Sequence, residues 1–178
     1  MSTAKPSAAA LYGAYLQYFS DRSPCGDDRI NNQCAVRLSV ALVRCGFTIR
    51  DEDFEDPRRI HRGRTACGIP EDHVCGAHEL EQALVQLWGD GEYYPRRAGA
   101  DMAAAMMRGR WGIVYFNNCF TRRGSTRARG DHIDLWTGAN YMNQLYGIGA
   151  GGDAAASDSL FSRSGNSGYY VRFIPLQF

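Results

Sequence analysis

The sequence predicts one domain of the α+β class, in which helices come first and an antiparallel sheet is built late. Apolar residues recur at helical spacing in the first half of the chain. The strand-like runs Gly112–Phe116, Asp131–Trp136 and Tyr169–Ile174 all lie in the second half. The chain has 178 residues, the length of one domain, and shows no internal repeat or long linker. We therefore expect a single domain over residues 1–178, with a cysteine-bearing helix packed on the sheet.

Four helices are expected along the chain. The first runs from a Ser7 N-cap to Phe19, and the second from about Cys34 to Cys45, with Gly46 in the position that commonly follows a helix. The others are expected at Ala77–Trp88 and around Asp101–Met107. The segment 51–76 between the second and third helices is polar, so we expect it to be irregular.

Composition excludes several classes of protein. Twenty Lys and Arg residues against 19 Asp and Glu residues leave a net charge of +1, which gives no reason to expect a nucleic-acid partner. No apolar run is long enough for a transmembrane helix, so no membrane partner is expected. The first ten residues lack the apolar core of a secretory signal peptide. A globular enzyme or binding module fits these features.

Cys34 is the candidate nucleophile because it opens the second predicted helix. A thiol in the first turn lies at the positive end of the helix dipole, among backbone N–H groups without intrahelical partners, and both effects favour the thiolate. Asn32 and Gln33 precede it and carry amides that can donate hydrogen bonds to an oxyanion. A cysteine that only fills the core is the alternative interpretation, and we adopt it for Cys45.

His132 is the candidate proton partner of that thiol. Strand alternation places His132 and Asp134 on the same face of the predicted strand. A third group should hold the second imidazole nitrogen and fix its tautomer. Asp134 shares the face of His132, and Asn143 follows the strand and can fold back beside it. Both stay candidates for the third catalytic residue.

No metal and no cofactor is expected. Cys67 and Cys75 lie eight residues apart (75 − 67), which is a poor spacing for a zinc knuckle and fits a local disulfide better. The histidines of the same polar segment raise the alternative of a metal site, but they do not improve that spacing. The run Gly147–Gly152 matches G-x-G-x-x-G, yet it lacks the strand, the helix and the acidic residue of a dinucleotide site.

Two sequence blocks resemble the type VI secretion amidase effectors of the fourth family. The first block is Asn32-Gln-Cys34-Ala-Val-Arg-Leu-Ser, and the second is Gly130-Asp-His132-Ile-Asp-Leu-Trp-Thr-Gly. These effectors are single-domain, NlpC/P60-like enzymes related to papain, so the resemblance implies that fold. It also implies a Cys34–His132 pair. The third member of the family is an Asp eleven residues after the His, a place that Asn143 takes here (132 + 11), and Asp131 stands where the family tends to have Gly.

The resemblance further implies an antibacterial toxin. Its substrate would be the stem peptides of peptidoglycan, cut at the bond between D-glutamate and meso-diaminopimelate. The protein would be made in the cytoplasm, exported by the type VI system and active in the periplasm of the target bacterium, where a cognate immunity protein blocks the cleft. Alternative functions are a thiol acyltransferase, a protein peptidase, or a catalytically silent module that binds wall fragments.

Overall fold

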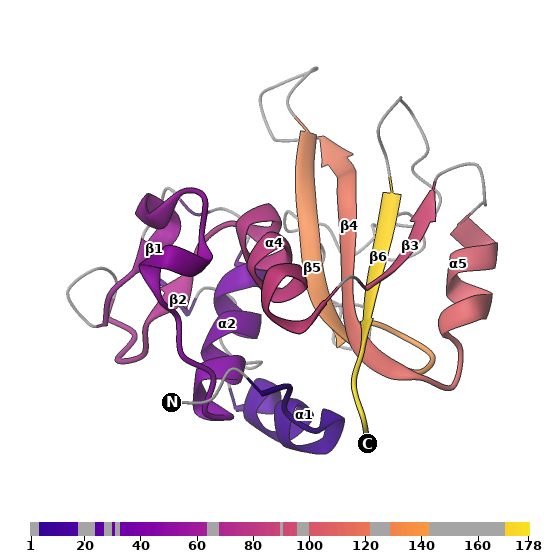
Figure 1. Cartoon of the computed structure of the whole chain (residues 1–178), viewed down its shortest axis with the longest axis horizontal. Coiled ribbons are helices and arrows are strands. Elements are labelled where there is room, and N and C mark those ends of the chain that lie inside the picture. Colours follow the sequence, from indigo (N-terminus) through magenta and orange to yellow (C-terminus); the bar gives the residue numbers. More distant parts are fainter. Residues whose placement is uncertain are drawn as a thin grey trace. The chain divides into compact units, whose positions relative to one another are not determined.

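The computed structural model describes residues 4–17, 24–26, 30, 33–63, 68–89, 91–95, 100–121, 129–142 and 170–178. Helices come first and an antiparallel sheet follows, so the predicted α+β class is confirmed (Figure 1). Two compact units are present: Met1–Asp90 with Leu176–Phe178, and Gly91–Pro175. The expectation of one domain over the whole chain stays a prediction. Among the described residues, no helix has the length and apolar character needed to cross a membrane.

Three α-helices are described in the first unit: α1 (Ala8–Leu16), α2 (Cys34–Arg44) and α4 (Ala77–Trp88). Ser7 caps α1 as predicted, because its Oγ accepts a hydrogen bond from the N–H of Ala10 at 3.2 Å. Gly46 follows α2 with a φ of +90°, the left-handed conformation that ends many helices. Every residue from Cys34 to Leu42 is buried, so α2 is the core helix of this unit.

The segment expected to be irregular instead contains short ordered elements. Two 3₁₀ turns, Asp51–Asp53 and Pro57–Arg59, lead into strand β1 (Ile60–His61), which pairs antiparallel with β2 (His73–Val74). Strands of two residues have no periodicity for a sequence pattern to reveal. The expectation of an irregular segment was therefore wrong for these residues.

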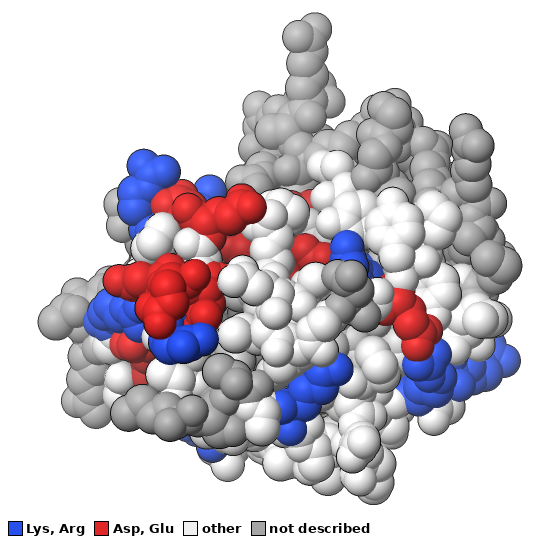
Figure 2. Space-filling model, viewed as in Figure 1, with Lys and Arg blue, Asp and Glu red and all other residues white. Residues whose placement is uncertain are grey.

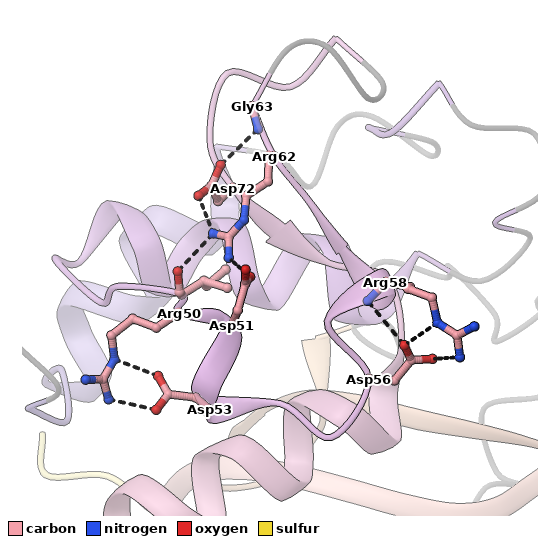
Figure 3. Close-up of polar contacts among 9 residues, drawn as sticks. Arg50, Asp51, Asp53, Asp56, Arg58, Arg62, Gly63 and Asp72 are labelled. Atoms are coloured by element: carbon pink, nitrogen blue, oxygen red, sulfur yellow. Dashed lines mark hydrogen bonds and ion pairs between the residues drawn. The ribbon is translucent and has the colours of Figure 1, made fainter.

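An ion-pair network fixes this hairpin. The guanidinium of Arg62 donates to the carboxylates of Asp51 and Asp72, the latter at 2.6 Å (Figure 3). It also donates to the backbone carbonyl of Ile49. Asp72 in turn accepts the N–H of Gly63 at 2.9 Å. Acidic and basic side chains crowd together over this part of the unit (Figure 2). Each exposed ion pair contributes only about 0.2–1 kcal/mol to the free energy of unfolding. The bonds that share Arg62 and Asp72 nevertheless set the geometry of the hairpin end.

The second unit is a four-stranded antiparallel sheet with one described helix, α5 (Ala100–Met107). The strand order is β3-β6-β4-β5, and the strands are β3 (Glu92–Pro95), β4 (Trp111–Thr121), β5 (Arg129–Thr137) and β6 (Tyr170–Pro175). The three predicted strands are confirmed, and β4 and β5 are longer than expected. β3, a short edge strand that ends in proline, was not predicted from the sequence.

Aromatic and aliphatic side chains form the core of the second unit. Its members come from α5 and from all four strands, and they include Tyr94, Ala103, Met107, Val114, Phe116, Cys119, Trp136, Tyr141, Val171 and Phe173. The indole N–H of Trp136 donates to the carbonyl of Met107 at 3.0 Å. This buried bond satisfies the polar atom of a large side chain and fixes the end of α5 against β5.

Gly112 on β4 lies under the Phe173 ring of the paired strand β6. A Cβ atom added there would run into that ring and come within 2.6 Å of the Ile174 carbonyl oxygen. Gly13 in α1 has nothing within 4 Å of the same position. The two glycines therefore make a matched pair for testing the close approach of β4 and β6.

We expect Gly112→Ala to lower the free energy of unfolding by about 1–3 kcal/mol, because overpacking displaces the Phe173 ring. Gly13→Ala should raise it by about 0.5–1 kcal/mol, because alanine is the better helix former. Urea denaturation followed by circular dichroism measures both. Equal effects of the two substitutions would contradict the close packing over Gly112.

Candidate active site

The proposed nucleophile, Cys34, is the first residue of α2 and is only 2% exposed. The preceding residue, Gln33, occupies the N-cap position, but its side chain makes no capping hydrogen bond to the helix. A thiol in the first turn of an eleven-residue helix lies close to the positive end of the dipole.

The side-chain amide of Gln33 forms hydrogen bonds with both backbone polar groups of Cys25. Its Oε1 accepts the Cys25 N–H at 2.7 Å, and its Nε2 donates to the Cys25 carbonyl, also at 2.7 Å. A longer bond of 3.4 Å joins Nε2 to the carbonyl of Ile30. We call this arrangement the Gln33 clamp. The clamp connects the backbone of Cys25 to the N-cap residue of α2. The oxyanion role of Gln33 stays a prediction. The same is true of Asn32, which lies outside the described residues.

His132 and Asp134 lie together on β5, as the alternation predicted. The His132 Nε2 is 3.4 Å from Oδ2 of Asp134, and both side chains are fully buried. The other carboxylate oxygen of Asp134 accepts the N–H of Leu135 at 2.8 Å, which fixes its orientation. A low local dielectric strengthens such a contact compared with water. The Asp134 carboxylate therefore lies where it can orient the imidazole through Nε2.

Two aromatic rings also pack against the imidazole of His132. Phe116 is the register partner of His132 on β4, and the two ring centroids are 6.2 Å apart with their planes inclined by 30°. Tyr141 meets His132 edge-on at 5.9 Å. Tyr141 reaches this place because the chain turns back after β5, where the N–H of Thr137 bonds the Asn140 carbonyl at 2.9 Å. The other predicted third residue, Asn143, lies two positions further on, outside the described residues.

Asp131, which stands where the resembled family tends to have Gly, forms a hydrogen bond with the neighbouring strand. Its Oδ1 accepts the backbone N–H of Asn118 at 2.8 Å. Asn118 has a φ of +51° and lies where the register of β4 and β5 shifts between Phe116 and Phe120. Three residues of β4, 117–119, lie opposite Asp131 at this irregularity, and the Asp131 carboxylate satisfies the backbone N–H of Asn118. Asp131 thus supports the end of the strand that carries His132.

The remaining thiols bear on the choice of nucleophile. Burial raises the pKa of the Cys45 thiol, which disfavours its thiolate and agrees with its interpretation as a non-catalytic cysteine. Cys45 is half-buried rather than fully in the core. The predicted Cys67–Cys75 disulfide and the Gly147–Gly152 run both involve residues outside those described.

One cluster was missed by the sequence analysis. The Sγ of Cys25 lies 3.8 Å from Nδ1 of His61, and with a ring nitrogen of His73 these atoms lie within 4.8 Å of one another. The expectation of no metal site weighed the histidines of the polar segment, including His61 and His73, together with Cys67 and Cys75, but did not consider Cys25. No motif spacing links positions 25, 61 and 73, because pairing of β1 with β2 brings the histidines together.

Comparisons with known proteins agree with the resemblance. Residues 30–166, well over half of the chain, match the family model described as "Type VI secretion system (T6SS), amidase effector protein 4". The fold is similar to that of the effector Tae4 from Salmonella typhimurium, solved in complex with the immunity protein Tai4 from Enterobacter cloacae. That likeness has a TM-score of 0.59 at 17% identity and covers 97% of this chain and 99% of the other.

A comparison with curated proteins found no match. At 17% identity the solved structure supports the fold alone, so the assignment depends on the family model and the length of its match. That match includes both Cys34 and His132 within residues 30–166. The chain belongs to the amidase effector protein 4 family of the type VI secretion system.

Proposed function

We propose that this amidase effector is a cysteine hydrolase of peptidoglycan, with Cys34 as its nucleophile and His132 as its proton carrier. The observation that carries the proposal is the buried contact of 3.4 Å between His132 and Asp134. A carboxylate in that position orients an imidazole for proton transfer. The start of α2 supplies the second requirement, a cysteine thiol in the first turn of a helix.

The reaction proceeds through an acyl-enzyme. The Cys34 sulfur attacks the amide carbonyl while His132 takes the thiol proton. Because Asp134 contacts Nε2, we assign this proton transfer to Nδ1. The C–N bond then breaks, and His132 returns the proton to the leaving amine. Water attacks the thioester, again with His132 as base, and releases the carboxylic acid and the thiolate.

The oxyanion of each tetrahedral intermediate needs hydrogen-bond donors. We propose the backbone N–H of Cys34, at the first turn of α2, as one donor. The second donor that we propose is a side-chain amide just before Cys34 in the sequence. The Gln33 Nε2 already donates to the carbonyls of Cys25 and Ile30, so Asn32 is the better choice between the two predicted amides.

The proposed substrate is the stem peptide of peptidoglycan, cut between D-glutamate and meso-diaminopimelate. The two motif blocks around Cys34 and His132 support this choice, because they resemble effectors with that activity. Type VI export from the cytoplasm would bring the enzyme to the periplasm of a target cell. The similar Salmonella effector was solved with an immunity protein, and we propose that a cognate immunity protein inhibits this chain as well.

Substituting either proposed catalytic residue should abolish cleavage. We expect Cys34→Ala and His132→Ala to lower the rate on purified muropeptides by at least about 10³-fold, because each removes a step of the reaction. Mass spectrometry of the products identifies the bond that is cut. Cys45→Ser, which removes a thiol at the other end of α2, should keep normal activity.

Other results would separate the alternative functions. Binding of muropeptides without cleavage by the wild type would support a wall-binding module. Transfer of the acyl group to an added amine in preference to water would support an acyltransferase. Unchanged cleavage by His132→Ala would contradict the proposed pair.

The third catalytic residue can be assigned by comparing Asp134→Asn with Asn143→Ala. The sequence pattern favours Asn143, whereas the contact of 3.4 Å favours Asp134. From the contact we expect Asp134→Asn to lower kcat by about 10²–10⁴-fold, since an amide favours the wrong tautomer. Asn143→Ala should have the smaller effect.

Asp131→Asn is the matched control on the same strand, because Asp131 faces the bulge rather than His132. It should leave kcat within about twofold of the wild type. A larger loss at Asn143→Ala than at Asp134→Asn would instead assign the third role to Asn143.

A further inference from the structure

Cys25, His61 and His73 form a compact group of soft and borderline ligands in the first unit. Their ligand atoms lie within 4.8 Å of one another, and the Cys25 Sγ is 3.8 Å from His61 Nδ1. Zinc bonds of about 2.3 Å to sulfur and 2.0–2.1 Å to nitrogen place the S and N atoms of a tetrahedral site about 3.6 Å apart. The thiol and the nearest imidazole therefore already have almost the separation that one shared ion requires.

The β1–β2 pairing builds the two-histidine side of the group. His61 and His73 are direct register partners, so their side chains share one face of the hairpin. Their ring centroids are 5.3 Å apart. The ion pair of Arg62 with Asp72, at 2.6 Å, holds the next residues of the same hairpin (Figure 3). The two imidazoles are thus positioned by backbone pairing and by a salt bridge beside it.

His73 has a backbone contact that orients its ring. Its Nδ1 lies 2.9 Å from the carbonyl oxygen of Glu71, a contact in which the ring N–H donates, and this assigns the ligand role to Nε2. Metal-bound histidines commonly donate the other ring N–H to a carbonyl in this way.

The third ligand is held by the start of α2. The Gln33 clamp bonds both the N–H and the carbonyl of Cys25 at 2.7 Å, and the Cys25 side chain is 1% exposed. A second link runs from α2 to the hairpin, because Ser39 Oγ accepts the N–H of Val74 at 2.9 Å. The thiol and the imidazoles are therefore attached to the same helix.

We propose that Cys25, His61 and His73 bind one zinc ion, which joins the β1–β2 hairpin to the chain segment that leads into the nucleophile helix. Thiolate and imidazole are ligands that suit Zn²⁺, and three protein ligands leave a fourth position for water. Binding replaces the proton of the Cys25 thiol with a sulfur–zinc bond and releases that proton to solvent. This proposal goes beyond the proposed function and does not depend on it.

Metal titration of the full-length, reduced protein tests the site. Cys34→Ala serves as the parent, so that the nucleophile contributes no thiolate and catalysis plays no part in the readout. After treatment with a chelator, we expect one equivalent of Zn²⁺ to bind and to raise the Tm. Co²⁺ in its place should give the tetrahedral d–d bands and a thiolate charge-transfer band.

Matched variants in that parent assign the ligands. Cys25→Ser should remove the charge-transfer band, and His61→Gln, at a half-buried position, should lower the Zn²⁺ affinity by more than about 100-fold, since even loss of an outer-shell partner costs about 10–100-fold. His78→Gln and Cys45→Ser should behave as the parent does. Circular dichroism without metal checks that each variant folds.

Failure of the parent to bind Zn²⁺ at micromolar concentration would overturn the proposal. The same holds for a Co²⁺ spectrum without a thiolate band, or for a loss in His78→Gln equal to that in His61→Gln. None of these results bears on muropeptide cleavage by the wild type, so the site and the proposed function fail or stand separately.

Discussion

The Gln33 clamp is the interaction on which the organisation of the first unit depends. Its amide satisfies both backbone groups of Cys25 in a buried environment, where each unmade bond would cost about 1–3 kcal/mol. The same residue is the N-cap of α2, so it joins the segment around Cys25 to the turn that presents Cys34. An amide, with one acceptor and two donors, is the side chain that can serve an N–H and a carbonyl together.

In the second unit, the strand β5 determines the orientation of the His132 imidazole. A regular strand fixes which residues share a face, so His132 and Asp134 meet without any contribution from a loop. The neighbouring contacts also follow from the sheet: Phe116 is the register partner of His132, and Asp131 accepts the backbone N–H of Asn118. In the proposed function, the helix start presents the thiol of Cys34 and the strand presents the imidazole of His132.

The sequence predicted those features that local periodicity determines. The limits of α2 and the shared face of His132 and Asp134 follow from patterns within about a dozen residues, and the structure confirms both. The β1–β2 hairpin and the Cys25 cluster were beyond reach, because two-residue strands carry no pattern and their residues meet only through tertiary pairing. The role of Gln33 was also hidden, since the sequence shows an amide but not which backbone groups it meets.

A zinc ion at Cys25 would also change the redox chemistry of the unit. Cys75 packs against the same apolar cluster as Cys25, so the two thiols share a neighbourhood. In an oxidising compartment a thiolate attacks disulfides of the surrounding redox pool, and a neighbouring thiol can then displace the small thiol from the mixed disulfide, at rates set by thiolate fraction and access. Coordination occupies the sulfur lone pair and withdraws Cys25 from that exchange. The Gln33 clamp would then keep the geometry that α2 requires at Cys34, because Cys25 stays beside His61 and His73 instead of moving toward another cysteine.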